Sequence, residues 1–336
     1  MARMLTDMFL FENKTVFITG ATGTIGGGIL KYIVQNFYDY VKEIRILSRD
    51  EYKLAKLMDE FRMFPKLSPK MGDVRDLPLL KKYLNDVDVV IHSAALKRVE
   101  FGEYYPYELI KTNVEGTNNV VEACIENSVS SAILISTDKA VEPSSTYGAT
   151  KLCSERIFIS ANVDDRNNFR TKFSVVRLGN VINSRGSIFE IVKEKKLKGE
   201  PVFITDKNMT RFWITIEEAS RFVIKVLSMM EGGEIFIPKM RATRVLDVIR
   251  IIYPDAKVVE TKPRPGEKIH EKLVSDYEKR ICFENDDCYV VYPDIIEEKR
   301  PFNTTYLREF KKVDLSHSFS SQDYITLKPS EIFEDA

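Results

Sequence analysis

The chain has 336 residues, with 50 Lys and Arg against 50 Asp and Glu, and 44% of its residues are hydrophobic. That length allows two domains, or one large α/β domain with a smaller attachment, and the composition excludes collagen, coiled coil and a disordered chain. The formal net charge of zero argues against partners that bind mainly through charge, so we expect no nucleic acid and no membrane surface.

The sequence shows no signal for export, membrane insertion or metal binding. The first 12 residues carry no charged segment followed by a long apolar stretch, and nowhere is there a run of about 18 apolar residues. The four cysteines (Cys124, Cys153, Cys282 and Cys288) have no CxxC spacing, so we expect neither a zinc site nor a disulfide framework. We expect a cytoplasmic protein whose acid–base chemistry rests on Tyr, Lys and Asp, because only three histidines are present.

Short β-branched strands alternate with helix-length segments through the first half of the chain. Strands are expected at residues 15–19, 44–47, 87–91, 132–135 and 173–177, and helices at 25–36 and 52–62. This alternation predicts right-handed βαβ units and a doubly wound parallel sheet of the Rossmann type. Prolines and charges increase after about residue 180. We therefore predict a dinucleotide-binding domain at 1–179 and a smaller substrate-binding domain at 180–336, with some later segments packing back on the sheet.

Three glycines join the first strand to the first helix, in the segment Gly20-Ala-Thr-Gly23-Thr-Ile-Gly26. Glycines let the backbone turn tightly and approach a pyrophosphate, whose charge then lies at the helix N-terminus. The GxxGxxG spacing is the variant typical of short-chain dehydrogenases/reductases. A plain turn is the alternative, but the position between a β-branched strand and a helix argues against it.

The residues after the second strand bear on the choice between NAD and NADP. NAD-binding proteins generally place an acidic side chain there, which accepts from the ribose 2′-hydroxyl. Here Ser48 and Arg49 come first, and the Arg fork suits a 2′-phosphate, to which Lys53 adds a second positive charge. A solvated helix start is the alternative for these cations. We predict NADP, with Asp73 and Val74 beside its adenine.

Tyr147 and Lys151 are four residues apart, which places both on one face of a helix. A phenol is a useful base at neutral pH only when a neighbouring ammonium stabilises its anion, and Lys151 is the candidate. Thr137 follows the strand at 132–135, at the edge where parallel sheets bind ligands. Thr137, Tyr147 and Lys151 together form the redox set of a short-chain dehydrogenase. A capped strand end and a surface pair are the alternative.

Asp138 and Lys139 add an acid–base pair that simple oxidation does not need. An enzyme that eliminates water after oxidation needs an acid for the departing hydroxyl and a base for the proton next to the new ketone. Two adjacent groups that shift each other's protonation can serve both roles. A surface ion pair is the alternative for Asp138 and Lys139.

The segment from His92 to Lys97 follows the strand at 87–91 and carries small residues where a cofactor passes close to the backbone. Ser93 is therefore a candidate cofactor contact. Lys97 either reaches the substrate or is solvated, and His92 is expected to be a hydrogen-bonded core residue rather than a base.

These residues resemble one family along nearly the whole chain. The motifs are TGATGTIG, LSRDE, GDVRD, HSAALKRVE, IKTNVEGTNNV, STDKAVEP, YGATKLCSE, VVRLGNVINSRGS, TDKNMTRFWIT, GGEIFIPKM, RPGEKIHE and the tail segment Phe319-Ser-Ser-Gln-Asp323. They closely resemble the inverting UDP-N-acetylglucosamine 4,6-dehydratases, extended short-chain dehydrogenases that act at the start of pseudaminic acid synthesis. STDK, rather than the TDE of retaining sugar dehydratases, is among the specific motifs.

The resemblance implies a hydro-lyase that uses NADP to convert UDP-N-acetylglucosamine to UDP-2-acetamido-2,6-dideoxy-beta-L-arabino-hex-4-ulose by oxidation, water elimination and hydride return. It implies that Tyr147 is the base at the C4 hydroxyl, Lys139 the base at C5 and Asp138 the acid at C6. The implied cofactor contacts are Gly20, Thr22, Gly23, Thr24, Ile25, Gly26, Ser48, Arg49, Lys53, Asp73, Val74, Ser93, Tyr147 and Lys151. The implied contacts to the nucleotide sugar are Lys97, Asn180, Val181, Arg264 and Glu267. A homo-oligomer is also implied.

Two positions depart from the family pattern: Asn183 stands where glycine is usual, and Phe101-Gly102 replaces a stretch of small residues. Both bear on substrate fit rather than on reaction type. A UDP-sugar 4-epimerase and a retaining dehydratase share the fold, the loop and YxxxK, and remain alternatives. A non-enzymatic NADP-binding regulator is the alternative from another class.

Overall fold

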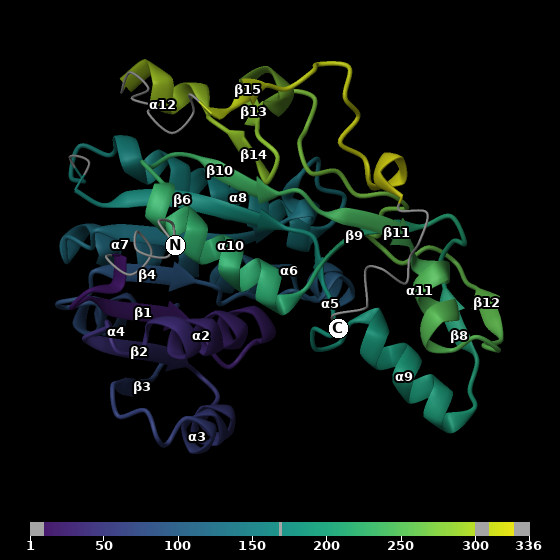
Figure 1. Cartoon of the computed structure of the whole chain (residues 1–336), viewed down its shortest axis with the longest axis horizontal. Helices are drawn as coiled ribbons and strands as arrows, with labels where there is room; N and C mark the ends of the chain where they lie inside the picture. The colour runs from purple at the N-terminus through teal and green to yellow at the C-terminus, as the bar shows by residue number, and fades with distance from the viewer. Residues whose placement is uncertain (1–9, 168–169, 300–308, 326–336) are drawn as a thin grey trace.

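A ten-stranded sheet forms the centre of the structure, a computed structural model in which residues 10–167, 170–299 and 309–325 are described (Figure 1). Its strands lie in the order β15-β13-β14-β10-β6-β5-β4-β1-β2-β3. The parallel part consists of β1 (Thr15–Thr19), β2 (Glu43–Ser48), β3 (Leu67–Met71), β4 (Val89–His92), β5 (Ser131–Thr137), β6 (Lys172–Leu178) and β10 (Ile235–Pro238). The antiparallel edge consists of β14 (Cys288–Val291), β13 (Cys282–Glu284) and β15 (Lys311–Lys312).

Helices cover both faces of the sheet, which explains why its central strands are apolar along their whole length. On one face, α2 (Thr24–Phe37) packs against α10 (Ile216–Met229), with α3 (Glu51–Glu60) near the sheet edge (Figure 1). The other row consists of α4 (Leu77–Tyr83), α7 (Gly116–Glu126) and α8 (Thr146–Ser160), with α7 touching both of the others. All five residues of β1 and all four of β4 are buried. The predicted doubly wound Rossmann fold is confirmed.

Segments that follow residue 180 build a smaller lobe beside the carboxyl ends of the strands (Figure 1). It contains β7 (Asn180–Val181), α9 (Ile188–Lys198), β8 (Val202–Ile204), β9 (Thr210–Ile214), β11 (Arg241–Arg244), α11 (Val245–Ile252) and β12 (Val258–Glu260). Its apolar contacts include a cluster around Val192, Val202 and Ile249. Residues 216–238, 282–291 and 311–312 return to the large sheet through α10, β10 and the antiparallel strands. The chain therefore passes more than once between the large sheet and the smaller lobe.

Short helical segments connect these elements close to the sheet edge. They are α5 (Val99–Tyr104), α6 (Pro106–Leu109), the π-helical turn η1 (Ile110–Glu115), the 3-10 turns η2 (Asp138–Ala140), η3 (Ala161–Val163), η4 (Glu278–Ile281) and η6 (Ser321–Tyr324), and α12 (Asp294–Lys299).

No helix in the described part of the chain is long and apolar enough to cross a membrane. Within the same residues, His, Cys, Asp and Glu side chains nowhere gather in a group of three that could hold a metal ion.

Candidate active site

A cavity of about 310 Å³ lies where β1 and β2 end and α2 begins. Its floor is the glycine loop, which only glycine can form at two positions. Gly20 has a φ of +69°, and a Cβ there would lie 2.7 Å from the backbone nitrogen of Ala94. A Cβ on Gly26 would lie 2.5 Å from the carbonyl oxygen of Gly20. The loop is therefore packed tightly against β4, and its backbone is exposed to whatever occupies the cavity.

Most of the residues predicted to bind the cofactor line this cavity. They are Gly20, Thr22, Gly23, Ser48, Arg49, Lys53, Asp73, Val74 and Ser93. Thr24, Ile25 and Gly26 lie behind the loop in the first turn of α2. The Thr22 and Ser48 hydroxyls are 3.0 Å apart, so the ends of the loop and of β2 are joined by a hydrogen bond.

The cations at the rim of the cavity are paired with carboxylates. Arg49 lies 3.7 Å from Asp73, and Lys53 lies 2.6 Å from Asp50. Burial would raise the pKa of Asp73, but its hydrogen bonds from Arg75 and the charge of Arg49 hold that pKa below its ordinary value. The side chains of Arg49 and Lys53 are about half exposed. Both therefore remain available to an anionic group at the rim.

Arg185 also lines the cavity, although it was not among the residues predicted to bind the cofactor. Its guanidinium donates to the carbonyl of Thr22 at 2.6 Å, and its backbone nitrogen donates to the Thr24 hydroxyl at 3.2 Å. The segment after β7 thus closes over the glycine loop from the smaller lobe. A lone Arg within the Gly- and Ser-containing run Asn183-Ser-Arg-Gly-Ser187 was the only sequence signal for this contact.

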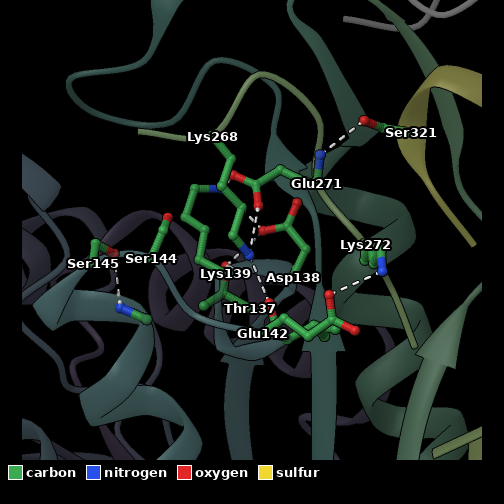
Figure 2. Close-up of polar contacts among 12 residues, drawn as sticks. Thr137, Asp138, Lys139, Glu142, Ser144, Ser145, Lys268, Glu271, Lys272 and Ser321 are labelled. Atoms are coloured by element: carbon green, nitrogen blue, oxygen red, sulfur yellow. Dashed lines mark hydrogen bonds and ion pairs between the residues drawn. The ribbon is translucent and has the colours of Figure 1, made fainter. Parts of the chain in front are cut away.

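The acid–base pair lies directly after β5, in the turn η2. The Lys139 amine donates to Asp138 Oδ1 at 2.9 Å (Figure 2). It also donates to Asn180 Oδ1 at 2.9 Å. The Thr137 hydroxyl donates to the same Asp138 oxygen at 2.9 Å and caps the turn η2. Asp138 is fully buried. The Lys139 side chain is 21% exposed, so Asp138 and Lys139 form a largely buried pair rather than a surface ion pair.

A third charge, the carboxylate of Glu271, lies 3.5 Å from the Lys139 amine, and sequence reasoning missed it (Figure 2). Burial alone would lower the pKa of Lys139, but the charges of Asp138 and Glu271 outweigh it and raise that pKa. Burial, aided by the charge of Asp138, raises the pKa of Glu271 against the effect of Lys139. Lys139 consequently rests as an ammonium ion, and the site must remove a proton from it before it can act as a base.

The helix α8 brings Tyr147 and Lys151 to the same place. Its N-terminus is capped by Ser145, which accepts from the Gly148 nitrogen, and by Glu103 of α5, which accepts from the Thr146 nitrogen at 2.7 Å. Gly148 allows the helix to touch η2, because a Cβ there would lie 2.2 Å from the carbonyl oxygen of Lys139. Sequence reasoning did not identify Glu103 as a cap.

The structure changes the expected relation between Tyr147 and Lys151. The Lys151 amine donates to the carbonyl of Ile135 at 2.8 Å, and burial lowers its pKa to about 8. Burial raises the pKa of Tyr147 to about 12, and the cation that opposes this rise most is Lys139. In this structure Lys139, rather than Lys151, is thus the ammonium that favours the phenolate, because the Lys151 amine is directed to the end of β5.

The residues expected to hold the sugar nucleotide occupy different environments. Asn180 contacts Lys139 directly, whereas the side chain of Val181 is buried, so Val181 offers only its backbone. Glu267 accepts from the Thr205 hydroxyl at 2.5 Å. Arg264, three residues before Glu267, is exposed. Lys97, which follows β4, is also exposed, and the charge of Lys139 is one of those that act on its amine. Of these residues, Asn180 therefore contacts the pair directly, whereas Lys97 and Arg264 are exposed.

His92 and Asn183 have structural explanations. The His92 ring is buried between the hydroxyls of Thr19 at 2.7 Å and Thr117 at 3.1 Å, and burial lowers its pKa to about 3. His92 is the core residue that the sequence predicted. Asn183 has a φ of +55°, a conformation that glycine adopts easily and asparagine tolerates, so the unusual residue keeps the turn.

Comparisons with known proteins agree with this geometry. Residues 16–293 match the family described as "Polysaccharide biosynthesis protein". A relative from Campylobacter jejuni named UDP-N-acetylglucosamine 4,6-dehydratase (inverting) is 39% identical over 318 residues, which is 94% of each chain. A Methanocaldococcus jannaschii protein named as an uncharacterized membrane protein is 43% identical over 84% of this chain and 87% of its own. A Rickettsia massiliae protein named UDP-glucose 4-epimerase is 34% identical over 97% and 96%.

The similarity extends to a solved structure. The X-ray structure of Pen from Bacillus thuringiensis is 32% identical and superposes with a TM-score of 0.86. The match covers 94% of this chain and 95% of that protein. It therefore includes both the large sheet and the smaller lobe.

Proposed function

The chain belongs to the polysaccharide biosynthesis protein family, and from that premise we propose that it is an inverting UDP-N-acetylglucosamine 4,6-dehydratase. The observation that carries the proposal is the buried pair of Asp138 and Lys139 next to Tyr147. Oxidation and hydride return need only the redox set of Thr137, Tyr147 and Lys151. An additional acid and base, here directly after β5, are what the elimination of water requires.

NADP is the cofactor that the cavity supports best. The glycine cradle, which a Cβ at Gly20 or Gly26 would fill, fits a pyrophosphate that approaches the backbone closely. Arg49 and Lys53 at the rim suit a 2′-phosphate, and Arg185 closes the loop from the other side. NADP held by these residues would supply the hydride acceptor for sugar C4 and the hydride donor for C6.

The side chains around the sugar then have separate tasks. Tyr147 takes the proton of the C4 hydroxyl as the ketone forms, helped by the positive charge of Lys139. The ketone acidifies the C5 hydrogen, and Lys139 removes it once its own proton has passed to Asp138. Asp138 protonates the departing C6 hydroxyl, so that water leaves. C5 is then reprotonated from the opposite face, which gives the inverted 4-keto-6-deoxy sugar. We propose that this product enters pseudaminic acid synthesis, and the support for this step is the sequence resemblance.

The test is incubation of the purified protein with NADP⁺ and UDP-N-acetylglucosamine in D₂O, followed by proton NMR. We expect a new C6 methyl signal, deuterium at C5 and ring couplings of the inverted sugar. A methyl signal with retained C5 configuration identifies a retaining dehydratase. Formation of the C4 epimer without a methyl signal identifies an epimerase, and NADP binding without any reaction identifies a regulator.

We also propose that the protein acts in the cytoplasm as a homo-oligomer. The four cysteines are free thiols, which suits a reducing compartment. The sequence resemblance is the support for an oligomer. Light scattering coupled to size-exclusion chromatography measures the assembly, and a monomeric mass at micromolar concentration contradicts this part of the proposal.

A further inference from the structure

Glu271 is a buried carboxylate beside the catalytic pair that the proposed reaction does not use. Its side chain is 3% exposed, and Oε1 lies 3.5 Å from the Lys139 amine. Among the described residues, neither Glu271 Oε2 nor Asp138 Oδ2 has a hydrogen-bond partner. Figure 2 shows both carboxyl groups beside the end of Lys139. Two buried carboxyl groups thus interact with the same ammonium group, and within the part of the chain that the structure describes each has one oxygen atom without a hydrogen-bond partner.

Glu271 interacts with its neighbours through charge rather than through fixed hydrogen bonds. The charged and titratable groups that face it are Asp138, Lys139, Tyr147, Arg211 and Lys268. Lys268 lies 3.9 Å away and Arg211 lies 4.0 Å away, both beyond hydrogen-bond distance. Lys268 donates to the carbonyl of Val141, and Arg211 donates to backbone carbonyls. Both cations therefore keep hydrogen-bond partners if the charge of Glu271 is removed.

The tail segment 319–323 holds the backbone of Glu271 in place. The Glu271 nitrogen donates to the Ser321 hydroxyl at 3.0 Å, and the Ser321 nitrogen donates back to the Glu271 carbonyl at 2.8 Å. The Ser321 hydroxyl also lies 2.6 Å from the hydroxyl of Thr210 in β9. Ser321 is fully buried. A motif near the C-terminus is thus connected to the acid–base pair through one residue.

We propose that Glu271, held by Ser321, is a positioning residue that controls whether Lys139 carries its proton. This inference rests on the proposed function, in which Lys139 must become a neutral amine. The proton then moves from the Lys139 nitrogen to an Asp138 oxygen, so that one N–H bond breaks and one O–H bond forms. The pair becomes an amine and a carboxylic acid, which are the two forms that elimination needs. An ionised Glu271 opposes this transfer, and a protonated Glu271 permits it.

The decisive variant is Glu271→Gln, which removes the charge and keeps the shape. Without this anion the Lys139 ammonium loses its proton more easily. The rising limb of kcat for C5 deuterium exchange should therefore move to lower pH, by about 1–3 units for a charge at this distance. Ser321→Ala should move the limb in the same direction by less, because it loosens Glu271 without removing its charge.

The matched control is Glu142→Gln. Figure 2 shows Glu142 near the pair, but it bonds to the partly exposed Lys272 at 2.9 Å and is not among the charges that act on Lys139. In Glu142→Gln the rising limb of kcat should stay at the wild-type pH. A residue that serves packing alone would lower the rate at every pH without moving the limb.

A second readout does not depend on turnover. With ¹³Cε-lysine labelling and NADP⁺ present, NMR titrates the Lys139 signal directly, and Lys139→Arg assigns it. We expect the midpoint to fall in Glu271→Gln and to stay unchanged in Glu142→Gln. If UDP-N-acetylglucosamine does not react, the proposed function fails while this titration still tests Glu271. An unchanged midpoint in a Glu271→Gln protein with wild-type Tm overturns the inference. If that variant does not fold, an unchanged midpoint in Ser321→Ala overturns it.

Discussion

At the scale of single residues, Lys139 separates elimination from simple oxidation. Replacement of Lys139 by Ala removes the base at C5 but leaves the cavity that surrounds the glycine loop intact. Water loss should fall by at least about 10²–10⁴-fold, the usual contribution of a positioned base. The C6 methyl signal in NMR measures this loss, and calorimetry shows that NADP still binds.

Lys272→Ala is the control for this prediction, because Lys272 is a neighbouring lysine that bonds to Glu142 and not to Asp138. Its rate of water loss should equal that of the wild type. Wild-type turnover by Lys139→Ala would remove Lys139 from the mechanism.

Arg49 tests the choice of cofactor. An Arg–phosphate contact of about 1.5–3 kcal/mol corresponds to roughly ten- to a hundred-fold in affinity. Arg49→Ala should therefore weaken NADP binding by that factor and leave NAD binding nearly unchanged, as measured by calorimetry.

Arg75 provides the control, since it bonds to the same Asp73 but does not line the cavity. Arg75→Ala should retain the preference for NADP. Equal affinity of the wild-type protein for NAD and NADP would contradict the assignment.

At the scale of elements, the loop at 261–268 packs against the N-terminus of α8. The Ser144 hydroxyl donates to the carbonyl of Gly266 at 2.9 Å, and Gly266 has a φ of +73°. A Cβ on Gly266 would lie 2.6 Å from Ser145. Glycine thus lets this loop approach the catalytic helix, and prolines on both sides of Arg264 restrict its backbone.

Arg264 on this loop is exposed, and we expect it to bind the diphosphate or ribose of the substrate. Such a contact is equally strong in the ground state and the transition state. Arg264→Ala should therefore raise KM for UDP-N-acetylglucosamine, weaken inhibition by UDP and leave kcat nearly unchanged. Steady-state kinetics measures all three. Lys262→Ala, an exposed cation on the same loop, should change none of them. Unchanged UDP binding by Arg264→Ala would place the nucleotide elsewhere.

At the scale of the whole molecule, one buried ion network joins the sheet, the catalytic helix and the C-terminal segments. Arg177 of β6 is fully buried and donates to Glu155 of α8 at 2.7 Å and to Glu278 of η4 at 2.9 Å. The Ser136 hydroxyl of β5 donates to Glu155 at 2.6 Å. Loss of one partner would leave a buried charge without compensation, so this network couples the sheet, the catalytic helix and the segment before β13 energetically.

This network should make stability depend on acid pH. Burial would raise the pKa of Glu278, but Arg177 outweighs it and lowers that pKa from 4.5 to about 2. A carboxylate whose pKa is lower in the folded protein stabilises the fold at every pH above its pKa in the unfolded chain. That contribution, on the order of 3 kcal/mol, should be lost as the pH falls from about 4.5 to about 2. Urea unfolding at successive pH values measures the free energy of unfolding.

Glu278→Gln should flatten this acid dependence, because the amide does not titrate. The exposed pair of Glu194 and Lys198 supplies the control, and Glu194→Gln should leave the acid dependence nearly as it is. An equally steep acid dependence in Glu278→Gln would assign the loss of stability to other carboxylates.

Local patterns in the sequence determined the Rossmann order, the glycine loop, the helical pair of Tyr147 and Lys151, and the position of Asp138 and Lys139 after a strand. Each of these depends on the spacing of neighbouring residues, and strands that alternate with helices leave few topologies open. The structure places Asp138 and Lys139 together, as their adjacency implied.

Tertiary structure alone decided which distant groups surround that pair. Glu271 approaches Lys139 from 132 residues away in the chain, Ser321 holds Glu271 from another 50 residues on, and Arg185 reaches the glycine loop 163 residues from Thr22. The direction of the Lys151 amine toward Ile135 was equally hidden. Side-chain charge and burial act through space, and no short-range pattern records which segments folding brings within a few ångströms of one another.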